Sequence, residues 1–156
     1  MFEQDEFWMR RAIAAAEQAG ELNEVPIGAC LIDKSGELLA VAGNRTIVDS
    51  DPTAHAEILV LREAAGKIGN YRLTETALYT TIEPCIMCAG ALVNARIGRL
   101  IFGAHDERFG AVSSVFQLCN SSSLNHQIEI SSGVLAADCR RLMRDFFRVR
   151  RNAKRV

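Results

Sequence analysis

The sequence lacks the features that mark membrane and secreted proteins. None of its apolar runs approaches the roughly 20 residues that a membrane-spanning helix requires. Its acidic start, Met1 to Glu6, is unlike a signal peptide, which has a basic start followed by an apolar run. Its five cysteines are an odd number, which does not suit a disulfide framework. We therefore expect a cytoplasmic protein that has no membrane partner.

The chain also lacks internal repeats and any stretch that resembles a linker. Its 156 residues are enough to bury a substantial core. The proportions of 49% apolar and 24% charged residues are ordinary for a soluble globular protein. We expect residues 1–156 to form a single domain.

Charge is distributed unevenly, although the net charge of the whole chain is only −1. Residues 140–156 contain eight basic residues and one acidic residue, Asp145, so this segment carries +7 and residues 1–139 carry −8. A basic tail on an acidic body suggests a localised anionic partner, and phosphates are the obvious candidate. The alternative is that the basic run is only the solvated face of a helix, which composition alone favours.

Two short motifs contain residues that suit a hydrolytic zinc site. The first is His55-Ala56-Glu57, and the second is Pro84-Cys85-Ile86-Met87-Cys88. Together they supply one imidazole, two thiols and one carboxylate. Zinc prefers tetrahedral nitrogen and sulfur ligands, and catalytic sites keep three protein ligands and one open position for water. We expect His55, Cys85 and Cys88 to bind one zinc ion per chain.

The spacing of these residues restricts where such a site can lie. Cys85 and Cys88 are three residues apart, so on a helix they share one face, and Pro84 suits the first turn of that helix. His55 and Glu57 are two residues apart, which would place them on roughly opposite sides of a helix body. They can therefore share a site only over the N-terminal end of a helix. We expect two helix N-termini to face one ion.

The charges of this ligand set leave a separate role for Glu57. Two thiolates neutralise the zinc ion, a neutral His55 adds no charge, and a water as fourth ligand would have a lowered pKa. Glu57 is then more useful as a base that moves protons from this water to a leaving amine. The alternative is a structural zinc site or a redox pair, which a lone Cys-x-x-Cys also allows. We find no convincing fourth protein ligand, so we favour the catalytic interpretation.

The pattern of apolar and turn residues predicts strands that alternate with helices. Strands are expected at 25–32, 38–42, 76–81, 100–103 and 127–130, and helices at 7–20, 55–67, from Pro84 to about 95, and at about 135–152. The last helix is amphipathic and basic. This alternation implies an α/β fold with three α/β/α layers on a mixed central sheet. Both zinc helices follow strands, so we expect the site at strand ends.

The two zinc motifs resemble the zinc-dependent nucleoside and nucleobase deaminase superfamily. Further stretches along nearly the whole chain resemble the bacterial tRNA-specific adenosine deaminases. These stretches are Asn44-Arg45, residues 51–57, 70–73, 88–92, 96–99, 102–106 and 133–136, and the end of the chain from Asp145 to Arg151. The family commonly has Lys-x-Gly after the segment that ends at Asp106, whereas this chain has Glu107-Arg108-Phe109-Gly110.

This resemblance implies a cytidine-deaminase-like fold and a homodimeric hydrolase. The implied reaction is the deamination of adenosine to inosine at the wobble position of a tRNA anticodon loop, with zinc-activated water. His55, Cys85 and Cys88 match the metal ligands of the family, and Glu57 matches its proton-transfer residue. Asn44 matches a residue that hydrogen-bonds the flipped base. The stretches that surround the RNA loop contribute Asp106, Phe147 and Arg150.

Two other functions compete with this one. The first is a small-molecule deaminase that acts on a cytosine or guanine nucleobase or nucleoside, which would not need the basic C-terminal helix. The second is a zinc-stabilised RNA-binding module without catalysis, which would have no use for Glu57. Single residues also have ordinary structural explanations in place of a role in RNA binding. Asn44 could simply belong to a turn, and Phe146 and Phe147 could pack in the core.

Overall fold

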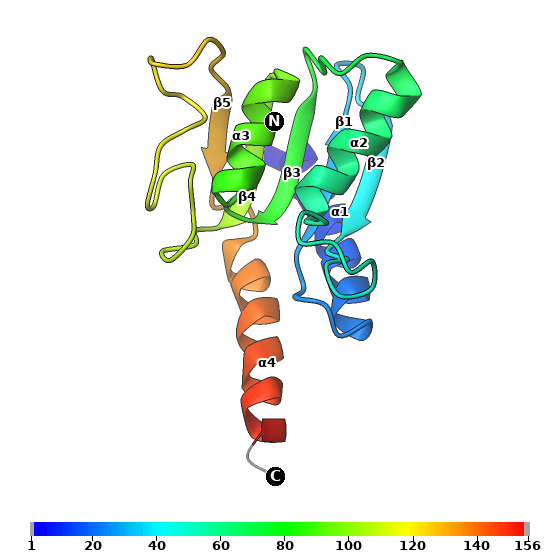
Figure 1. Cartoon of the computed structure of the whole chain (residues 1–156), viewed down its shortest axis with the longest axis vertical. Helices are drawn as coiled ribbons and strands as arrows, with labels where there is room; N and C mark the ends of the chain where they lie inside the picture. Colours follow the sequence, from blue (N-terminus) through cyan, green and yellow to red (C-terminus); the bar gives the residue numbers. More distant parts are fainter. Residues whose placement is uncertain (1, 155–156) are drawn as a thin grey trace.

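The computed structural model describes residues 2–154, which form a five-stranded sheet flanked by four helices (Figure 1). The helices are α1 (Phe2–Glu21), α2 (Ala56–Ile68), α3 (Ile86–Ala95) and α4 (Ala136–Lys154). The strands are β1 (Gly28–Ile32), β2 (Leu38–Gly43), β3 (Ala77–Ile82), β4 (Arg99–Ala104) and β5 (Glu129–Ser132).

The sheet is mixed, as the alternation of elements predicted. Its strand order is β2-β1-β3-β4-β5. β1 pairs antiparallel with both β2 and β3, whereas β3, β4 and β5 run parallel. The β1–β2 hairpin closes through Asp33, whose carboxylate accepts the backbone N–H groups of Ser35 and Glu37. Because β3, β4 and β5 run parallel, their C-terminal ends lie at the same end of the sheet, which is the end that matters for function.

Helices cover both faces of the sheet, which confirms the predicted three layers. Consecutive residues of β3 point to opposite faces, so Leu78 packs with α2 and α3 while Tyr79 packs with α1 and α4. The core on the first side includes Val60 and Leu92, and the core on the second side includes Met9. Both faces of β3 are therefore buried, which explains its unbroken run of buried residues.

The structure changes three details of the predicted elements. The last strand lies two residues later than the predicted 127–130. α3 begins at Ile86, so Cys85 precedes the helix instead of lying in it. α1 begins at Phe2, five residues before the predicted start at residue 7. The final residues of the basic run, Arg155 and Val156, lie outside the described residues, and the single domain over residues 1–156 stays a prediction.

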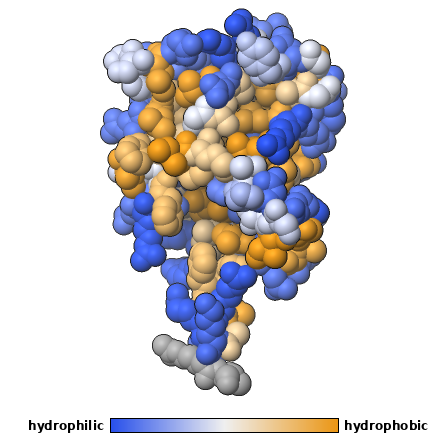
Figure 2. Space-filling model, viewed as in Figure 1, coloured by the Kyte–Doolittle hydropathy of each residue, from blue (hydrophilic) through white to orange (hydrophobic). Residues whose placement is uncertain are grey.

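α4 extends past the end of the sheet (Figure 1). Figure 2 shows strongly hydrophilic residues on this projecting part, while apolar residues gather over the body of the molecule. Only Cys139 of α4 is fully buried, which fits a helix that rests on the sheet at its start. Among the helices of residues 2–154, none has both the length and the apolar character needed to cross a membrane.

We predict that Gly28→Ala destabilises the protein, because Gly28 packs directly against the α1 backbone. A Cβ at this position would lie 2.0 Å from the carbonyl oxygen of Ala12 and 2.5 Å from the amide nitrogen of Ala16. Overpacking of this kind costs about 1–3 kcal/mol. Gly66→Ala is the matched control, because Gly66 lies within α2 with open space around its Cα, and this change should stabilise the helix by up to about 1 kcal/mol. Urea denaturation measures both, and equal midpoints would contradict the packing described.

Candidate active site

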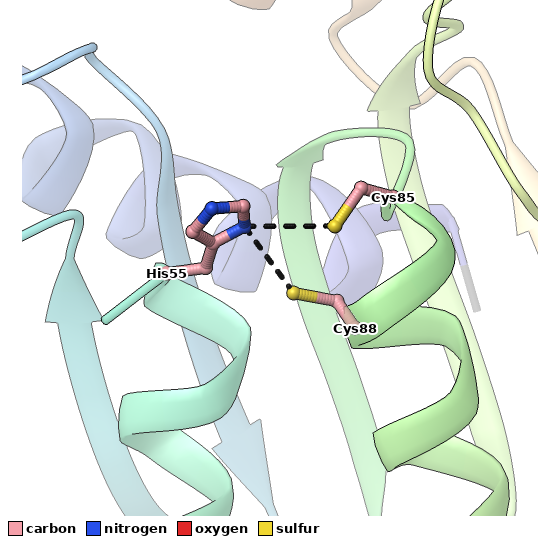
Figure 3. Close-up of side chains that lie close together, drawn as sticks. All are labelled: His55, Cys85 and Cys88. Carbon is pink, nitrogen blue, oxygen red and sulfur yellow. Dashed lines mark hydrogen bonds between the residues drawn. The ribbon is translucent and has the colours of Figure 1, made fainter. Parts of the chain in front are cut away.

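The N-termini of α2 and α3 meet at one point, where they bring three side chains together. His55 is the N-cap residue of α2 and Cys85 is the N-cap residue of α3, while Cys88 lies in the first turn of α3. Nδ1 of His55 lies 3.6 Å from Sγ of Cys85 and 3.5 Å from Sγ of Cys88 (Figure 3). Neither N-cap side chain caps its own helix, because both point into the cluster instead.

This cluster fits a tetrahedral metal ion. Its three ligand atoms lie within 4.8 Å of one another. With zinc–sulfur and zinc–nitrogen bonds of about 2.3 and 2.0–2.1 Å, tetrahedral geometry places nitrogen and sulfur ligands about 3.6 Å apart, which agrees with the observed separations. Within residues 2–154 the group contains no fourth His, Cys, Asp or Glu ligand. Three protein ligands with an open position are typical of catalytic zinc sites.

The two thiols of the cluster differ in their electrostatic surroundings. A hydrogen bond from Cys88, together with one from His55, lowers the pKa of Cys85 to about 4 although burial opposes the shift. The same hydrogen bond to Cys85, together with burial, raises the pKa of Cys88. The pair therefore carries its negative charge on Cys85, and a bound cation would take the place of the Cys88 proton.

Glu57 lies beside the cluster and is not one of its ligands. It is in the first turn of α2 and only 4% exposed. Burial raises the pKa of Glu57 to about 7. Its Oε1 atom is buried and accepts no hydrogen bond from any residue in the described part of the chain. A buried carboxylate oxygen without a protein partner is unusual, and it is suited to exchange protons with a bound molecule.

A cavity of about 570 Å³ opens above this cluster, within the usual range of small-molecule sites. Six of the eight residues that the sequence singled out line it: Asn44, His55, Glu57, Cys85, Asp106 and Phe147. Cys88 is fully buried behind the cavity wall. Arg150 lies outside the cavity, in a neighbouring groove. The fold thus gathers residues from four separate parts of the chain at one cavity.

Comparison with known proteins identifies the family of this site. Residues 3–151 match the MafB19-like deaminase family. A tRNA-specific adenosine deaminase of Haemophilus influenzae is 47% identical over 152 residues, which are 97% of this chain and 88% of that protein. One from Bacillus subtilis is 43% identical over 153 residues, 98% of this chain and 94% of that protein. The chain belongs to the tRNA-specific adenosine deaminase family.

A solved structure supports the same assignment for the fold. It comes from a study of A-to-I editing by tRNA:A34 deaminases at the wobble position of transfer RNA. It is 42% identical to this deaminase, covers 87% of this chain and 98% of its own, and superposes with a TM-score of 0.84. The predicted cytidine-deaminase-like α/β fold is therefore confirmed.

Asn44 has a structural contact in this deaminase and also lines the cavity. Its Oδ1 accepts the backbone N–H of Ala56 at 2.9 Å, at the start of α2. This bond caps α2 in place of His55, whose ring is directed at the thiols. Because the oxygen faces the backbone, the amide N–H groups of Asn44 remain available to donate to a ligand. The turn role and the base-binding role are therefore compatible.

The aromatic residues of α4 have separate surroundings. Phe147 is 39% exposed and lines the cavity, whereas Phe146 is partly buried. The guanidinium of Arg150 lies 4.8 Å above the Phe146 ring and donates a hydrogen bond to the carbonyl oxygen of Asn23. Phe147 is thus the aromatic side chain of this pair that a ligand in the cavity can reach.

A basic groove of about 610 Å³ adjoins the cavity of the deaminase. Its basic lining residues are Arg108, Arg140, Arg144, Arg150, Arg151 and Lys154. Arg108 comes from the loop after β4, and the others lie on α4. The groove shares Arg108, Met143 and Phe147 with the cavity, so the two adjoin at these side chains. A ligand with phosphates in the groove could place one of its other groups in the cavity.

Sequence reasoning gave Glu83 no role, although the structure surrounds its carboxylate with donors. Burial alone would raise the pKa of Glu83, but hydrogen bonds from Ser114, Ser113 and Asp106 lower it to about 2. The sequence does contain one signal for a role of Glu83, which is its position as an acidic residue between an apolar strand and Pro-Cys-x-x-Cys. Such a residue in a buried stretch must find partners elsewhere in the chain. The loop residues Phe109 and Phe116, which line the cavity, carried no comparable signal.

We predict that Cys88→Ser abolishes tight zinc binding by this deaminase, because a hydroxyl is a poor replacement for a buried thiolate ligand. Zinc per purified chain should fall from about one to near zero. Cys30→Ser is the matched control, because Cys30 is also buried but donates only to the carbonyl oxygen of Trp8, which a hydroxyl can also do. A Cys88→Ser protein that keeps one tightly bound zinc would show that the ligand set is wrong.

Proposed function

We propose that this chain deaminates adenosine to inosine at the wobble position of a tRNA anticodon loop, with one zinc ion per chain. The relatives named above support the reaction and the substrate. The observation that carries the proposal is the unpartnered Oε1 of Glu57, at the wall of a cavity that His55 and Cys85 also line.

The proposed chemistry uses the ligand set and Glu57 in separate roles. Nδ1 of His55 and the two Sγ atoms of Cys85 and Cys88 would hold the ion. When bound, zinc supplies a water of lowered pKa as the nucleophile. Oε1 of Glu57 would accept a proton from the attacking water and pass it to N1 of adenine while the water oxygen adds at C6. Glu57 would then take the proton of the new C6 hydroxyl and deliver it to N6. The C6–N6 bond breaks, ammonia leaves, and the C6 carbonyl of inosine forms.

The remaining residues of the cavity would hold the base in place for this step. The amide N–H groups of Asn44 would donate to acceptor atoms of the adenine ring. Phe147 offers an exposed aromatic face at the cavity wall, on which a base can stack. Asp106 lies at the start of the loop that follows β4, and its carboxylate holds a turn of that loop by accepting the N–H groups of Arg108 and Phe109.

The adjoining basic groove supports an RNA substrate over a free nucleoside. An anticodon loop offers unpaired bases that can be splayed out at modest cost, unlike bases within a duplex. Its phosphates are near the splayed base, and the groove places six basic side chains next to the cavity. We include Arg150 in this phosphate-binding set. A small-molecule deaminase would have no need for these charges.

A homodimer and a cytoplasmic location are also part of the proposal. Both rest on the resemblance to the bacterial tRNA-specific adenosine deaminases and on the composition of the chain. A tRNA substrate is consistent with the cytoplasm, where the anticodon is accessible. Light scattering during gel filtration measures the mass in solution, and a mass of one chain would remove the dimer from the proposal.

The direct test is the formation of inosine in a tRNA transcript. The purified zinc protein is incubated with transcripts whose anticodon begins with adenosine, and sequencing detects inosine as a change from A to G. Free adenosine, cytidine and guanine are tested in parallel for release of ammonia. Inosine at the wobble position with no turnover of free compounds supports the proposal. Turnover of a free base or nucleoside without inosine in RNA would establish the small-molecule alternative instead.

We predict that Glu57→Gln keeps zinc and the fold but lowers turnover by at least about 100-fold, because general acid–base catalysis typically contributes 10²–10⁴-fold. The amide is similar in size but cannot accept and return the proton. Zinc per chain, the denaturation midpoint and single-turnover rates are measured together. Glu63→Gln is the matched control, because Glu63 is an exposed glutamate on the same helix. Near-normal turnover in a fully zinc-loaded Glu57→Gln protein would rule out the proton-transfer role.

We predict that neutralising Arg150 and Arg151 raises the KM for an anticodon stem-loop while zinc stays bound. Each lost phosphate contact should reduce the slope of log affinity against log salt by roughly 0.7–0.9. Binding is measured at several salt concentrations with the double glutamine variant. Neutralising Arg10 and Arg11 is the matched control, because these adjacent arginines lie on α1, outside the basic groove. Affinity and salt slope equal to those of the wild type would show that the basic run is only a solvated helix face.

A further inference from the structure

Glu83 holds a loop of the cavity wall by a concentrated set of hydrogen bonds. Its side chain is fully buried, between the end of β3 and Pro84-Cys85. Oε1 accepts the N–H of Asp106 at 3.1 Å and the hydroxyl of Ser114. Oε2 accepts the N–H groups of Val112, Ser113 and Ser114 at 3.1, 2.8 and 2.9 Å. All five donors belong to the loop of residues 105–116 that follows β4.

Three of these donors are consecutive backbone N–H groups, an arrangement that binds anions in many proteins. Here the anion is a carboxylate of the same chain. Further backbone bonds join the two segments, from Glu83 N–H to the Ala104 carbonyl and from Ala111 N–H to the Pro84 carbonyl, both at 2.8 Å. Gly110 allows this close approach, because a Cβ there would lie 2.3 Å from Cδ of Glu83.

The loop that Glu83 holds carries much of the wall of the cavity. Asp106, Arg108, Phe109, Val115 and Phe116 line the cavity, and Arg108 also lines the basic groove. Phe109 is 67% exposed, so its packing contributes little to the position of the loop. Ala111 and Val112 anchor the loop in the core, and the carboxylate of Glu83 ties its remaining turns directly to the segment that carries Cys85. That segment in turn supplies Cys85 to the candidate metal cluster.

We propose that Glu83 is a positioning residue, which sets the loop of residues 105–116 at a fixed place relative to Cys85 and thereby shapes the substrate-binding wall. The part that concerns substrate rests on the function proposed above. Both carboxylate oxygens are needed, because the donors divide between Oε1 and Oε2. A glutamine offers one acceptor oxygen and one NH₂ group, so one of the two donor sets loses its acceptor.

The test compares zinc-loaded Glu83→Gln with the wild-type protein by limited proteolysis with trypsin. Arg108 is the basic residue of the loop, so the rate of cleavage after Arg108 reports how often the loop opens. We expect this rate to rise by about tenfold or more, because hydrogen bonds to a charged group are lost while the rest of the protein stays folded. Zinc per chain should stay unchanged. Glu37→Gln is the matched control, because it removes the same charge at an exposed position in the β1–β2 turn.

Kinetics on an anticodon stem-loop supply the second measurement. We expect KM for Glu83→Gln to rise by about tenfold while kcat changes less, because the cavity wall is displaced but Glu57 and the metal ligands are not. Cleavage after Arg108 at the wild-type rate with an unchanged KM would overturn the proposal. Faster cleavage at every arginine alike would also overturn it, because it indicates general destabilisation. Loss of zinc with an unchanged rate of cleavage after Arg108 would overturn it as well.

Ser114→Ala is a milder variant that decides the question if Glu83→Gln does not fold. It removes only the hydroxyl donor to Oε1 and keeps the backbone donors. Faster cleavage after Arg108 in this variant supports the proposal, and an unchanged rate overturns it. The proteolysis needs no substrate, so it tests the role of Glu83 even if the wild type forms no inosine. The absence of inosine would refute the proposed function and leave the proteolysis result standing.

Discussion

Two helices begin at the same point of this molecule, and the chemistry of the site depends on that meeting. A helix N-terminus leaves backbone N–H groups without partners, and its dipole favours negative charge. The N-cap positions of α2 and α3 would ordinarily carry side chains that satisfy those groups. Here the N-cap residues His55 and Cys85 face the metal cluster instead. The capping of α2 is consequently supplied by Asn44, twelve residues away from its partner Ala56.

The cavity and the groove offer different surroundings to a ligand. The cavity contains a buried carboxylate and two of the three candidate metal ligands, where a low dielectric strengthens their interactions. The groove is lined by exposed basic residues, which suits phosphates that must bind and leave. Met143 and Phe147 line both spaces. α4 therefore joins the two, although only its first part rests on the sheet.

Loops form most of the cavity wall, yet they are held by buried charged or polar groups. Asn44 ties the connection between β2 and α2 to the start of α2, and Glu83 ties the loop after β4 to the segment before α3. Hydrogen bonds therefore fix both loops to the starts of the two helices at which the candidate metal ligands lie. A wall built in this way keeps its position relative to the candidate metal cluster.

The sequence by itself determined most of the elements and the grouping of the candidate metal ligands, because both depend on short-range patterns. Spacing of three residues between Cys85 and Cys88, and of two between His55 and Glu57, allowed a shared site only over helix N-termini. The structure has that arrangement, with Cys85 at the N-cap instead of inside the helix. The alternation of strands and helices likewise predicted the mixed three-layer fold.

Only the tertiary structure decided which distant residues meet at the cavity. Glu83 finds its partners 23 to 31 residues further along the chain, and no local pattern encodes that distance. The groove joins Arg108 to arginines of α4 because β4 and α4 pack together, which depends on strand order. The composition showed a basic run but not the cavity beside it. Periodicity specifies which face of an element is buried, whereas the partner of that face is chosen by packing over the whole chain.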